Sequence, residues 1–297
     1  DAEVYITNAC VTYLSFDDFE RGFCPTDATF ETRLSEYPLD ENGRTPLSLA
    51  AENGFFPIAA ALLEASNIIT LDFEAQKDND GLLPLSWAAR NGHIEVIKML
   101  LAHSNLERGD ANNPLLWAIL RDDLAAVELI LKAGLETAAT GWTDKVAPKA
   151  LCLAADLGKV PMFTCLLQNL SADVNCRGDK GMTPLMKAAL QGRHEMVEEL
   201  IRLNADPGLK DDQGRTAFSL AAAYGQDNIV SLLLARVRSK IDLDGKEKSG
   251  RTPLSLAAGN GHEGIVQMLL QLEGEVDVDS RDASGQTPLF WAARDGH

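Results

Sequence analysis

The sequence predicts an all-α fold in which short helical hairpins stack into an α-solenoid, and three observations support this prediction. The stretch TPLSLAAENG, which begins at Thr45, is the first of eight related copies that follow one another at steps of 30 to 38 residues. Most copies begin with a residue type that starts a helix, and each ends with one that stops a helix. A second apolar pair follows eight residues after the end of every copy except the last. Self-similarity at such a period is typical of solenoid proteins.

The first helix of each repeat is predicted from its two ends. Threonine is expected to cap the helix because its hydroxyl accepts a backbone N–H, and proline suits the first helical position because it has no N–H to lose. Glycine closes seven copies and Asp122 closes the third, as a left-handed C-terminal cap requires. The eight copies begin at Thr45, Leu83, Asn113, Lys149, Thr183, Thr216, Thr252 and Thr287.

The middle of each copy and the segment after it predict how the helices pack. Pairs of small residues such as Ala50-Ala51 recur four residues after the proline position, where they allow neighbouring helices to approach closely. In GHIEVIKMLL the apolar residues Ile94, Ile97, Leu100 and Leu101 recur at the spacing of an amphipathic helix. Polar segments such as KDNDG and RDASG then supply a tight turn. Each repeat is therefore predicted as turn, short helix, turn and longer helix.

The two ends of the chain depart from this period. Residues 1–39 do not match the repeat, and we expect them to form a helical N-terminal cap or linker. Residues 40–297 are expected to form one repeat domain of about eight repeats. The eighth copy stops at His297, where its second helix should begin, so we expect the last repeat to be truncated.

Composition limits the class of partner. The chain has 297 residues and a net charge of −17, which argues against nucleic-acid binding because that affinity depends on lysine and arginine at phosphates. We expect a protein partner that is basic or has an exposed apolar patch. Five scattered cysteines, no membrane-length apolar run and no signal peptide favour a cytoplasmic chain without membrane contact. The isolated chain is expected to be monomeric.

No catalytic or metal-binding motif stands out. The sequence lacks a P-loop, a G-x-S-x-G elbow and an H-E-x-x-H pair. The acidic turns at 78–81 and 242–245 lack the ligands that a calcium loop needs. His93, His262 and His297 follow the closing glycines, so we expect them to form hydrogen bonds between adjacent turns. We therefore predict no enzyme activity, no cofactor and no metal.

These columns together resemble ankyrin repeats over roughly residues 40 to 297. The shared pattern is D-x-x-G-x-T-P-L-x-x-A-A-x-x-G-H with the apolar pair that follows it. The resemblance implies helix-turn-helix units joined by short β-hairpin-like turns. The usual histidine after T-P-L is replaced by Ser48, Ser86, Ser219 and Ser255, which should lose a family hydrogen bond.

A second resemblance concerns the non-repeat end. The segment ACVTYLSFDDFERGFCPTDATFETRLSEYPL is similar to the region before the repeats of fungal NACHT and ankyrin proteins, which are NLR-like signalling NTPases. This resemblance implies that the chain is the regulatory C-terminal region of a larger protein whose NTPase domain lies upstream. Capping of the first repeat is the alternative for this segment.

The main functional hypothesis is a protein-interaction scaffold that binds its partner on the concave face of the solenoid. The family resemblance places partner contacts in the turns before Thr-Pro and in the residues before the closing glycine. The residues at these positions are Arg44, Glu52, Asn53, Asn79, Asp80, Leu82, Arg90, Asn91, Leu120, Arg121, Asp156, Leu157, Met182, Leu190, Gln191, Arg215, Tyr224, Arg251 and Asn260.

Two further hypotheses concern this face. The apolar members of the set would form a centre with a polar rim, as protein interfaces do. A purely structural spacer would instead have a polar face. Trp87, Trp117 and Trp291 share one column, where packing between first helices is expected and ligand contact is the alternative.

Overall fold

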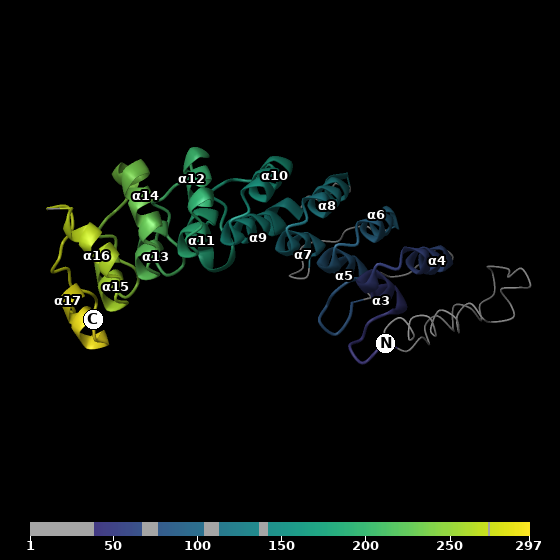
Figure 1. Ribbon diagram of the computed structural model, residues 1–297, viewed down its shortest axis with the longest axis horizontal. Helices are drawn as coiled ribbons and strands as arrows, with labels where there is room; N and C mark the ends of the chain where they lie inside the picture. Colours follow the sequence, from purple (N-terminus) through teal and green to yellow (C-terminus); the bar gives the residue numbers. More distant parts are fainter. Residues whose placement is uncertain (1–38, 67–76, 104–112, 137–141, 273) are drawn as a thin grey trace, which may run out of the picture. The chain divides into compact units, whose positions relative to one another are not determined.

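The computed structural model describes residues 39–66, 77–103, 113–136, 142–272 and 274–297, and these segments are helices and turns without a strand (Figure 1). The predicted all-α repeat solenoid is confirmed. The chain divides into two compact units, Asp1–Trp142 and Thr143–His297. The predicted cap over residues 1–39 lies outside the described residues except for its last one.

The described residues of the first unit form three helical hairpins. Their first helices are α3 (Pro46–Asn53), α5 (Pro84–Asn91) and α7 (Pro114–Arg121). Their second helices are α4 (Phe56–Ser66), α6 (Ile94–His103) and α8 (Leu124–Glu136). First helices pack on first helices, and second helices pack on second helices.

The second unit has the same construction. Its first helices are α9 (Trp142–Leu157, of which Trp142 falls in the first unit), α11 (Pro184–Leu190), α13 (Ala217–Ala223), α15 (Pro253–Gly259) and α17 (Pro288–Asp295). Its second helices are α10 (Val160–Leu170), α12 (His194–Arg202), α14 (Asp227–Val237) and α16 (Glu263–Leu270). Two 3-10 turns, η2 (Asp179–Gly181) and η3 (Arg238–Lys240), lie in the connections.

The predicted helix ends are confirmed in most repeats. The hydroxyl of Thr45 accepts the backbone N–H of Ser48 at 3.1 Å, and four other repeats form the same cap. Gly54 ends α3 with a φ of 72°, a conformation that glycine adopts without strain. Asp122 takes over this role in the third repeat with a φ of 63°. Leu83 caps α5 without a side-chain hydrogen bond.

The fourth repeat differs from its expected start. Its copy begins at Lys149, yet α9 begins at Trp142 and contains Pro148. The copy has no Thr-Pro head, so no capping hydroxyl stops the helix from extending toward the N-terminus. Pro148 is the seventh residue of this 16-residue helix, so it removes one backbone hydrogen bond of the helix interior.

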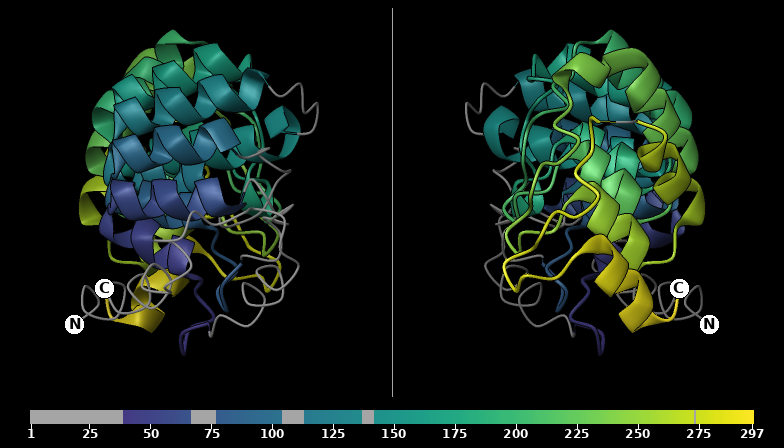
Figure 2. Two further views of the ribbon diagram at one scale, coloured as in Figure 1. Left: turned by 90° about the vertical axis from the view of Figure 1, so that its right-hand side faces the viewer. Right: turned by 90° about the vertical axis from the view of Figure 1, so that its left-hand side faces the viewer.

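Small side chains let the first helices stack closely. Ala50, Ala88, Ala188 and Ala221 are fully buried where first helices meet. Within each unit the helices of successive repeats lie in parallel tiers, with the turns on another side (Figure 2). Two serines that replace the family histidine contact the capping threonine, since the hydroxyl oxygens of Ser48 and Thr45 lie 3.1 Å apart and those of Ser255 and Thr252 lie 3.2 Å apart.

The turns before the first helices are hairpin-like, as the family resemblance implies. In one of them the N–H of Asp211 donates to the carbonyl of Arg215 at 2.9 Å. Neighbouring turns are joined as well, because the N–H of Lys248 donates to the carbonyl of Gln213 at 2.8 Å. The first helices and these turns together form what we call the first-helix face of each unit.

Candidate protein-binding surface

Arginine and tryptophan side chains stack along the first-helix face of the first unit. The Cζ atom of Arg44 lies 5.5 Å from the ring centroid of Trp87. Arg90 lies between two rings, with its Cζ 4.9 Å from the centroid of Trp87 and 4.8 Å from that of Trp117. A cation over an indole face is attracted by the ring quadrupole. We call Arg44, Trp87, Arg90 and Trp117 the first stack.

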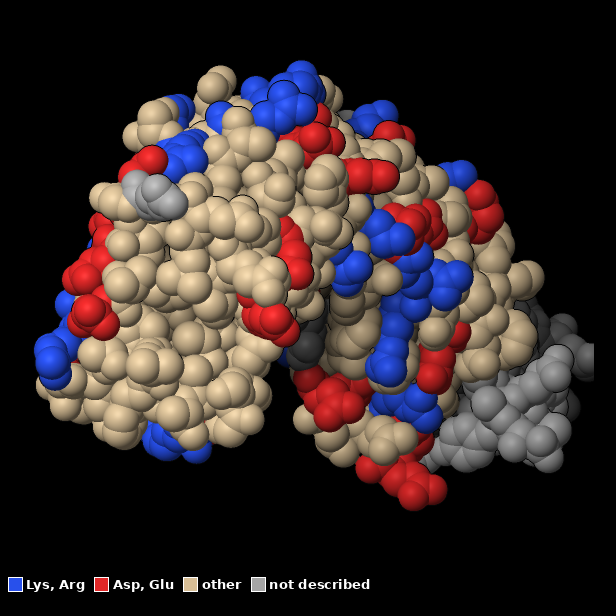
Figure 3. All heavy atoms as spheres, turned by 60° about the vertical axis from the view of Figure 1, so that its left-hand side comes forward, with Lys and Arg blue, Asp and Glu red and all other residues tan. Residues whose placement is uncertain are grey.

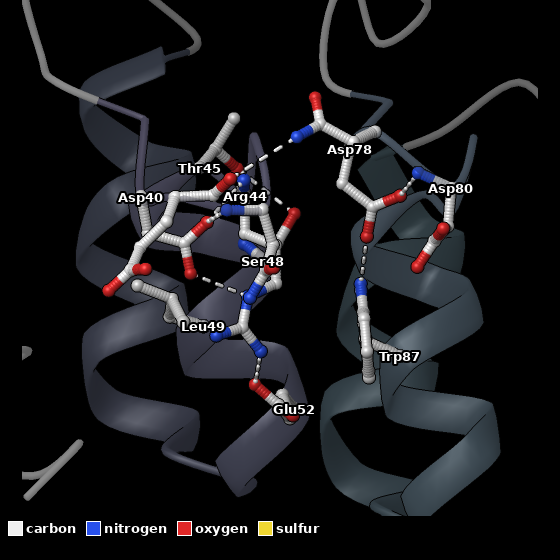
Figure 4. Close-up of polar contacts among 12 residues, drawn as sticks. Asp40, Arg44, Thr45, Ser48, Leu49, Glu52, Asp78, Asp80 and Trp87 are labelled. Atoms are coloured by element: carbon white, nitrogen blue, oxygen red, sulfur yellow. Dashed lines mark hydrogen bonds and ion pairs between the residues drawn. The ribbon is translucent and has the colours of Figure 1, made fainter.

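A buried aspartate fixes Trp87 in this stack. The indole Nε1–H donates to Oδ2 of Asp78 at 2.8 Å (Figure 4). Oδ1 of Asp78 accepts the backbone N–H groups of Asp80 at 3.0 Å and Leu82 at 2.8 Å. The carboxylate therefore closes its turn with one oxygen and orients the tryptophan with the other.

Arg44 is neutralised within its own repeat. Its Nε lies 2.7 Å from Oδ2 of Asp40, and its Nη1 lies 2.5 Å from Oε2 of Glu52 (Figure 4). Burial acts to raise the pKa of Asp40, but hydrogen bonds from the backbone and side chain of Arg44 outweigh it and lower the pKa. Asp40 and Glu52 therefore balance the cation before any partner arrives.

A second stack lies in the second unit. Trp291 is held between two cations, with the Cζ of Arg251 4.1 Å and the Cζ of Arg294 3.9 Å from its ring centroid. Its Nε1–H donates to Oδ2 of Asp282 at 2.9 Å. Burial acts to raise the pKa of Asp282, but hydrogen bonds from Gln286, Trp291 and Ser284 lower it overall. We call Arg251, Trp291 and Arg294 the second stack.

Arg251 lacks the carboxylates that Arg44 has. Its Nη2 donates to the carbonyl of Ser255 at 2.9 Å, and its Nε is buried without a hydrogen-bond partner in the described part of the chain. No ion pair links it to a carboxylate of the described residues, whereas Arg215 pairs with Asp211 at 2.7 Å. Burial lowers the pKa of Arg251 because a guanidinium is less stable away from water.

A groove opens beside Arg251 on the first-helix face of the second unit. Its volume is about 620 Å³, and Tyr224 on its wall is 56% exposed. The lining residues are Arg215, Ala223, Tyr224, Glu247, Ser249, Arg251, Leu256, Asn260 and His262.

The surface carries both signs of charge. On the face drawn in Figure 3, basic side chains lie in groups beside acidic ones, so the net charge of −17 does not make the whole surface acidic.

Most of the predicted contact residues reach the surface. The exposed members are Asn53, Asn79, Asp80, Arg90, Leu120, Arg121, Gln191, Tyr224 and Asn260. The half-buried members are Arg44, Glu52, Asn91, Asp156, Leu157, Leu190, Arg215 and Arg251. Four of the predicted residues, Arg215, Tyr224, Arg251 and Asn260, line the groove of the second unit.

Two predicted contact residues are buried, so the expectation that they face solvent was wrong. Leu82 is 3% exposed and Met182 is 5% exposed. They share a turn position with Arg44, Arg215 and Arg251. At this position an apolar side chain packs fully inside, whereas an arginine buries its stem and keeps its charged end near the surface.

Some predicted contact residues are already engaged between repeats. The Nδ2 of Asn91 donates to the carbonyl of Glu52 at 2.8 Å, and the Nδ2 of Asn260 donates to the carbonyl of Ala223 at 2.7 Å. His93 and His262 reach the same two carbonyls through Nε2 at 2.9 Å and 3.0 Å, so the prediction of bonds between turns is confirmed for both. These groups hold the face in one shape.

Several groove residues were not among the predicted contacts. Glu247, Ser249, Leu256 and His262 line the groove through their position in space, next to Arg251 and Asn260. Sequence spacing could have indicated them, because Glu247 and Ser249 belong to the turn that ends at Arg251. Trp87, Trp117 and Trp291 are half-buried, as expected for packing between first helices.

The family comparison agrees with this repeat architecture. A family model described as ankyrin repeats (3 copies) matches residues 10–108, 68–141, 151–244 and 235–297. These matches cover most of the sequence, and the chain therefore belongs to the ankyrin repeat family. Ankyrin repeats generally mediate protein–protein interactions, and proteins built from them are typically non-enzymatic scaffolds.

The resemblance to NACHT proteins and the location of the chain stay predictions. No curated protein matches the chain, so the resemblance to NACHT proteins gains no support from a relative. Within the segments that the structure describes, no helix is long and apolar enough to cross a membrane. No cluster of three His, Cys, Asp or Glu suited to a metal occurs among those same residues. A cytoplasmic location remains a prediction.

Proposed function

We propose that the chain is a non-enzymatic scaffold that binds a protein partner on its first-helix face, with the groove beside Tyr224 and Arg251 as the central contact. The observation that carries this proposal is the groove itself, where an exposed tyrosine, a leucine and two arginines line one hollow. Tyrosine and arginine are enriched among residues that dominate binding energy. A spacer with a wholly polar face would not need an exposed tyrosine there.

The groove is held by contacts within the chain. Asn260 and His262 are both bonded to the carbonyl of Ala223, and the guanidinium of Arg215 is paired with Asp211. Side chains that are already fixed lose less conformational entropy when a partner binds. A partner could therefore use this surface without reshaping it.

The proposed partner is basic overall or has an exposed apolar patch. The net charge of −17 attracts a basic protein over distances of about 10 Å at moderate salt. An apolar patch would instead cover Tyr224 and Leu256 in the groove. A standard interface buries roughly 800 Å² on each partner, which several adjacent repeats can provide.

Site-specific photocrosslinking tests this proposal. A benzophenone amino acid is placed at Tyr224 in one chain and at Ser231 in another, because both residues are exposed and Ser231 lies on α14, a second helix. We expect protein adducts from position 224 in cells and few from position 231. Equal adducts at both positions, or more at 231, would contradict the assignment to the first-helix face.

A second candidate function concerns the segment before the repeats. Residues 9–39 resemble the region that follows the NTPase module of fungal NACHT and ankyrin proteins. The chain would then be the regulatory region of a signalling NTPase, in which partner binding controls assembly. Sequencing the coding region upstream of Asp1 tests this candidate: a P-loop there would support it, and a reading frame without one would refute it.

A further inference from the structure

We propose that Arg251 binds a carboxylate side chain, Asp or Glu, of a peptide segment of the protein partner. This inference rests on the proposed function, because it names what the groove of the second unit recognises. It adds a specific chemistry that the family membership does not give. Three features of Arg251 support it: its missing counterion, the space beside it and its fixed orientation.

Arg251 lacks a direct counterion because of the acidic residue in its own turn. Arg44 and Arg215 each pair with an aspartate four residues earlier, at 2.7 Å. The corresponding residue for Arg251 is Glu247, whose carboxylate turns back to its own loop. It accepts the N–H of Ser249 at 3.0 Å and the N–H of Arg251 at 3.3 Å, and it also bonds the Ser249 hydroxyl. The guanidinium is left without this partner.

The space beside Arg251 comes from a single residue difference between two repeats. The first repeat reads GRTPLSLAAENG, and the seventh reads GRTPLSLAAGNG. Glu52 of the first repeat pairs with Arg44, whereas Gly259 of the seventh has no side chain. A Cβ at Gly259 would lie 2.5 Å from Nη2 of Arg251. Glycine therefore removes a counterion and leaves room for the guanidinium.

The orientation of Arg251 is fixed before a ligand arrives. Its guanidinium lies 4.1 Å from the centroid of Trp291 and donates to the carbonyl of Ser255 at 2.9 Å. Its charge is already partly removed from water, and the carboxylates of Glu247, Asp282 and Asp295 act on it only through space, so no direct ion pair has to be displaced. A planar guanidinium in this state favours a carboxylate, which can accept two parallel N–H bonds.

The surroundings indicate what flanks the acid. Tyr224 and Leu256 form an apolar part of the groove, where an aromatic or aliphatic residue next to the acid would pack. Glu247 lies on the same wall and would repel an anion, but its oxygens are engaged by donors of its own turn. A basic partner is compatible with this site, because the groove recognises one side chain and not the net charge.

Peptide selection followed by a double-mutant cycle tests the inference. A random-peptide phage library is selected on the 297-residue chain, and the enriched peptides are expected to contain Asp or Glu beside an apolar residue. The best peptide and its Asp→Asn or Glu→Gln form are then titrated against the wild-type and Arg251→Gln chains by fluorescence anisotropy. A lost charged hydrogen bond should weaken binding about tenfold or more in the wild type. In the Arg251→Gln chain the two peptides should bind almost equally.

Further variants serve as controls for a general loss of structure. Gly259→Glu restores the carboxylate of the first repeat but also adds a Cβ that shifts the guanidinium of Arg251, so Gly259→Ala, which adds only the Cβ, is its matched control. Relative to Gly259→Ala, we expect about tenfold weaker binding of the acidic peptide to Gly259→Glu and no difference for its amide form. Arg294→Gln removes the other cation that contacts Trp291, one already paired with Asp295 at 2.8 Å, and should leave the acid preference intact.

The outcomes separate this inference from the proposed function. An acid preference that survives in the Arg251→Gln chain, or the absence of any acid preference, would overturn the role of Arg251. If Tyr224→Ser nevertheless weakens peptide binding, the groove remains the contact surface and only the role of Arg251 is lost. Peptides that bind the Tyr224→Ser and wild-type chains equally, without acid preference, would overturn both.

Discussion

The two Arg–Trp stacks use the same residue types at matching positions of their repeats, yet their charges are balanced differently. In the first stack Arg44 lies 5.5 Å from Trp87 and pairs with both Asp40 and Glu52. In the second stack Arg251 lies closer to its tryptophan, at 4.1 Å, and pairs with no carboxylate of the described residues. Arg44 is therefore balanced by direct ion pairs, whereas Arg251 has none among the described residues.

The difference shows how a repeat can be specialised without changing its backbone. The turn aspartate has one oxygen for its own turn and one for a side chain. That second oxygen binds an arginine four residues later in the case of Asp211, and a tryptophan nine residues later in the case of Asp78. When the acid is Glu247 and the helix residue is Gly259, Arg251 receives no direct ion pair from its own repeat, although Trp291 still receives Asp282 as Trp87 receives Asp78.

The largest expected effect is a loss of stability, and it distinguishes Asp78 of the first stack from Asp282 of the second. Asp78→Ala removes the acceptor of three donors from a site that is 7% exposed, including the N–H of the buried Leu82. Unpaired buried donors are costly, so we expect the free energy of unfolding to fall by about 3 kcal/mol. Urea denaturation followed by circular dichroism measures this change.

Asp282→Ala is the matched variant in the second stack. Asp282 also accepts three hydrogen bonds, from Ser284, Gln286 and Trp291, but its surroundings are open to water. Water can replace the lost acceptor, so its effect should be clearly smaller than that of Asp78→Ala. Equal losses in the two variants would show that burial does not distinguish the stacks.

The next largest effect comes from making the first stack resemble the second. Glu52→Gly removes the ion pair with Arg44 and places glycine inside α3. We expect a loss of about 1.5 kcal/mol in the free energy of unfolding, of which roughly 1 kcal/mol is the helix cost of glycine. Glu52→Gln removes the charge and keeps a helix-forming side chain, so it should cost about 0.5 kcal/mol. Losses of the same size in both variants would contradict this division.

A smaller effect tests the additional ring of the first stack. Trp117→Leu leaves Arg90 with one tryptophan, as Arg294 has in the second stack. Leucine occupies this column in other repeats, for example at Leu153 and Leu220, so the helix packing should tolerate it. We expect a loss of about 1 kcal/mol from the missing cation–π contact. Trp117→Phe keeps a ring and should lose less in the same urea experiment.

The sequence predicted most of the fold because the repeat fixes helix ends through local chemistry. Thr45 caps α3 and Gly54 ends it, as their residue types require. The prediction was wrong at α9, where Lys149 replaces the capping threonine and Pro148 lies inside the helix. Without a hydroxyl cap, the start of a helix depends on tertiary packing, which local patterns do not contain.

The candidate site was less accessible to prediction. The repeat pattern identified Arg251 and Tyr224 as variable surface positions, and both line the groove. It did not separate Arg251 from Leu82, which occupies the same turn position but is buried. Whether such a side chain is buried, paired or available depends on contacts with the next repeat, and only the structure places Trp291 and Gly259 beside Arg251.

The smallest expected effect is a pH dependence of the first stack. The pKa of Asp40 is lower in the folded chain than the usual value of about 3.9 for an unfolded one. Its ionised form therefore stabilises the fold above about pH 4, and this contribution is lost as the pH falls through the lower folded pKa. Asp40→Asn should cost about 0.5 kcal/mol at pH 7, because asparagine keeps the oxygen that accepts the N–H groups of Asn42 and Arg44 and loses only the charge. The difference from the wild type should shrink toward zero in urea titrations near pH 3, and a difference that stays constant from pH 7 to pH 3 would show that Arg44 does not depend on the charge of Asp40.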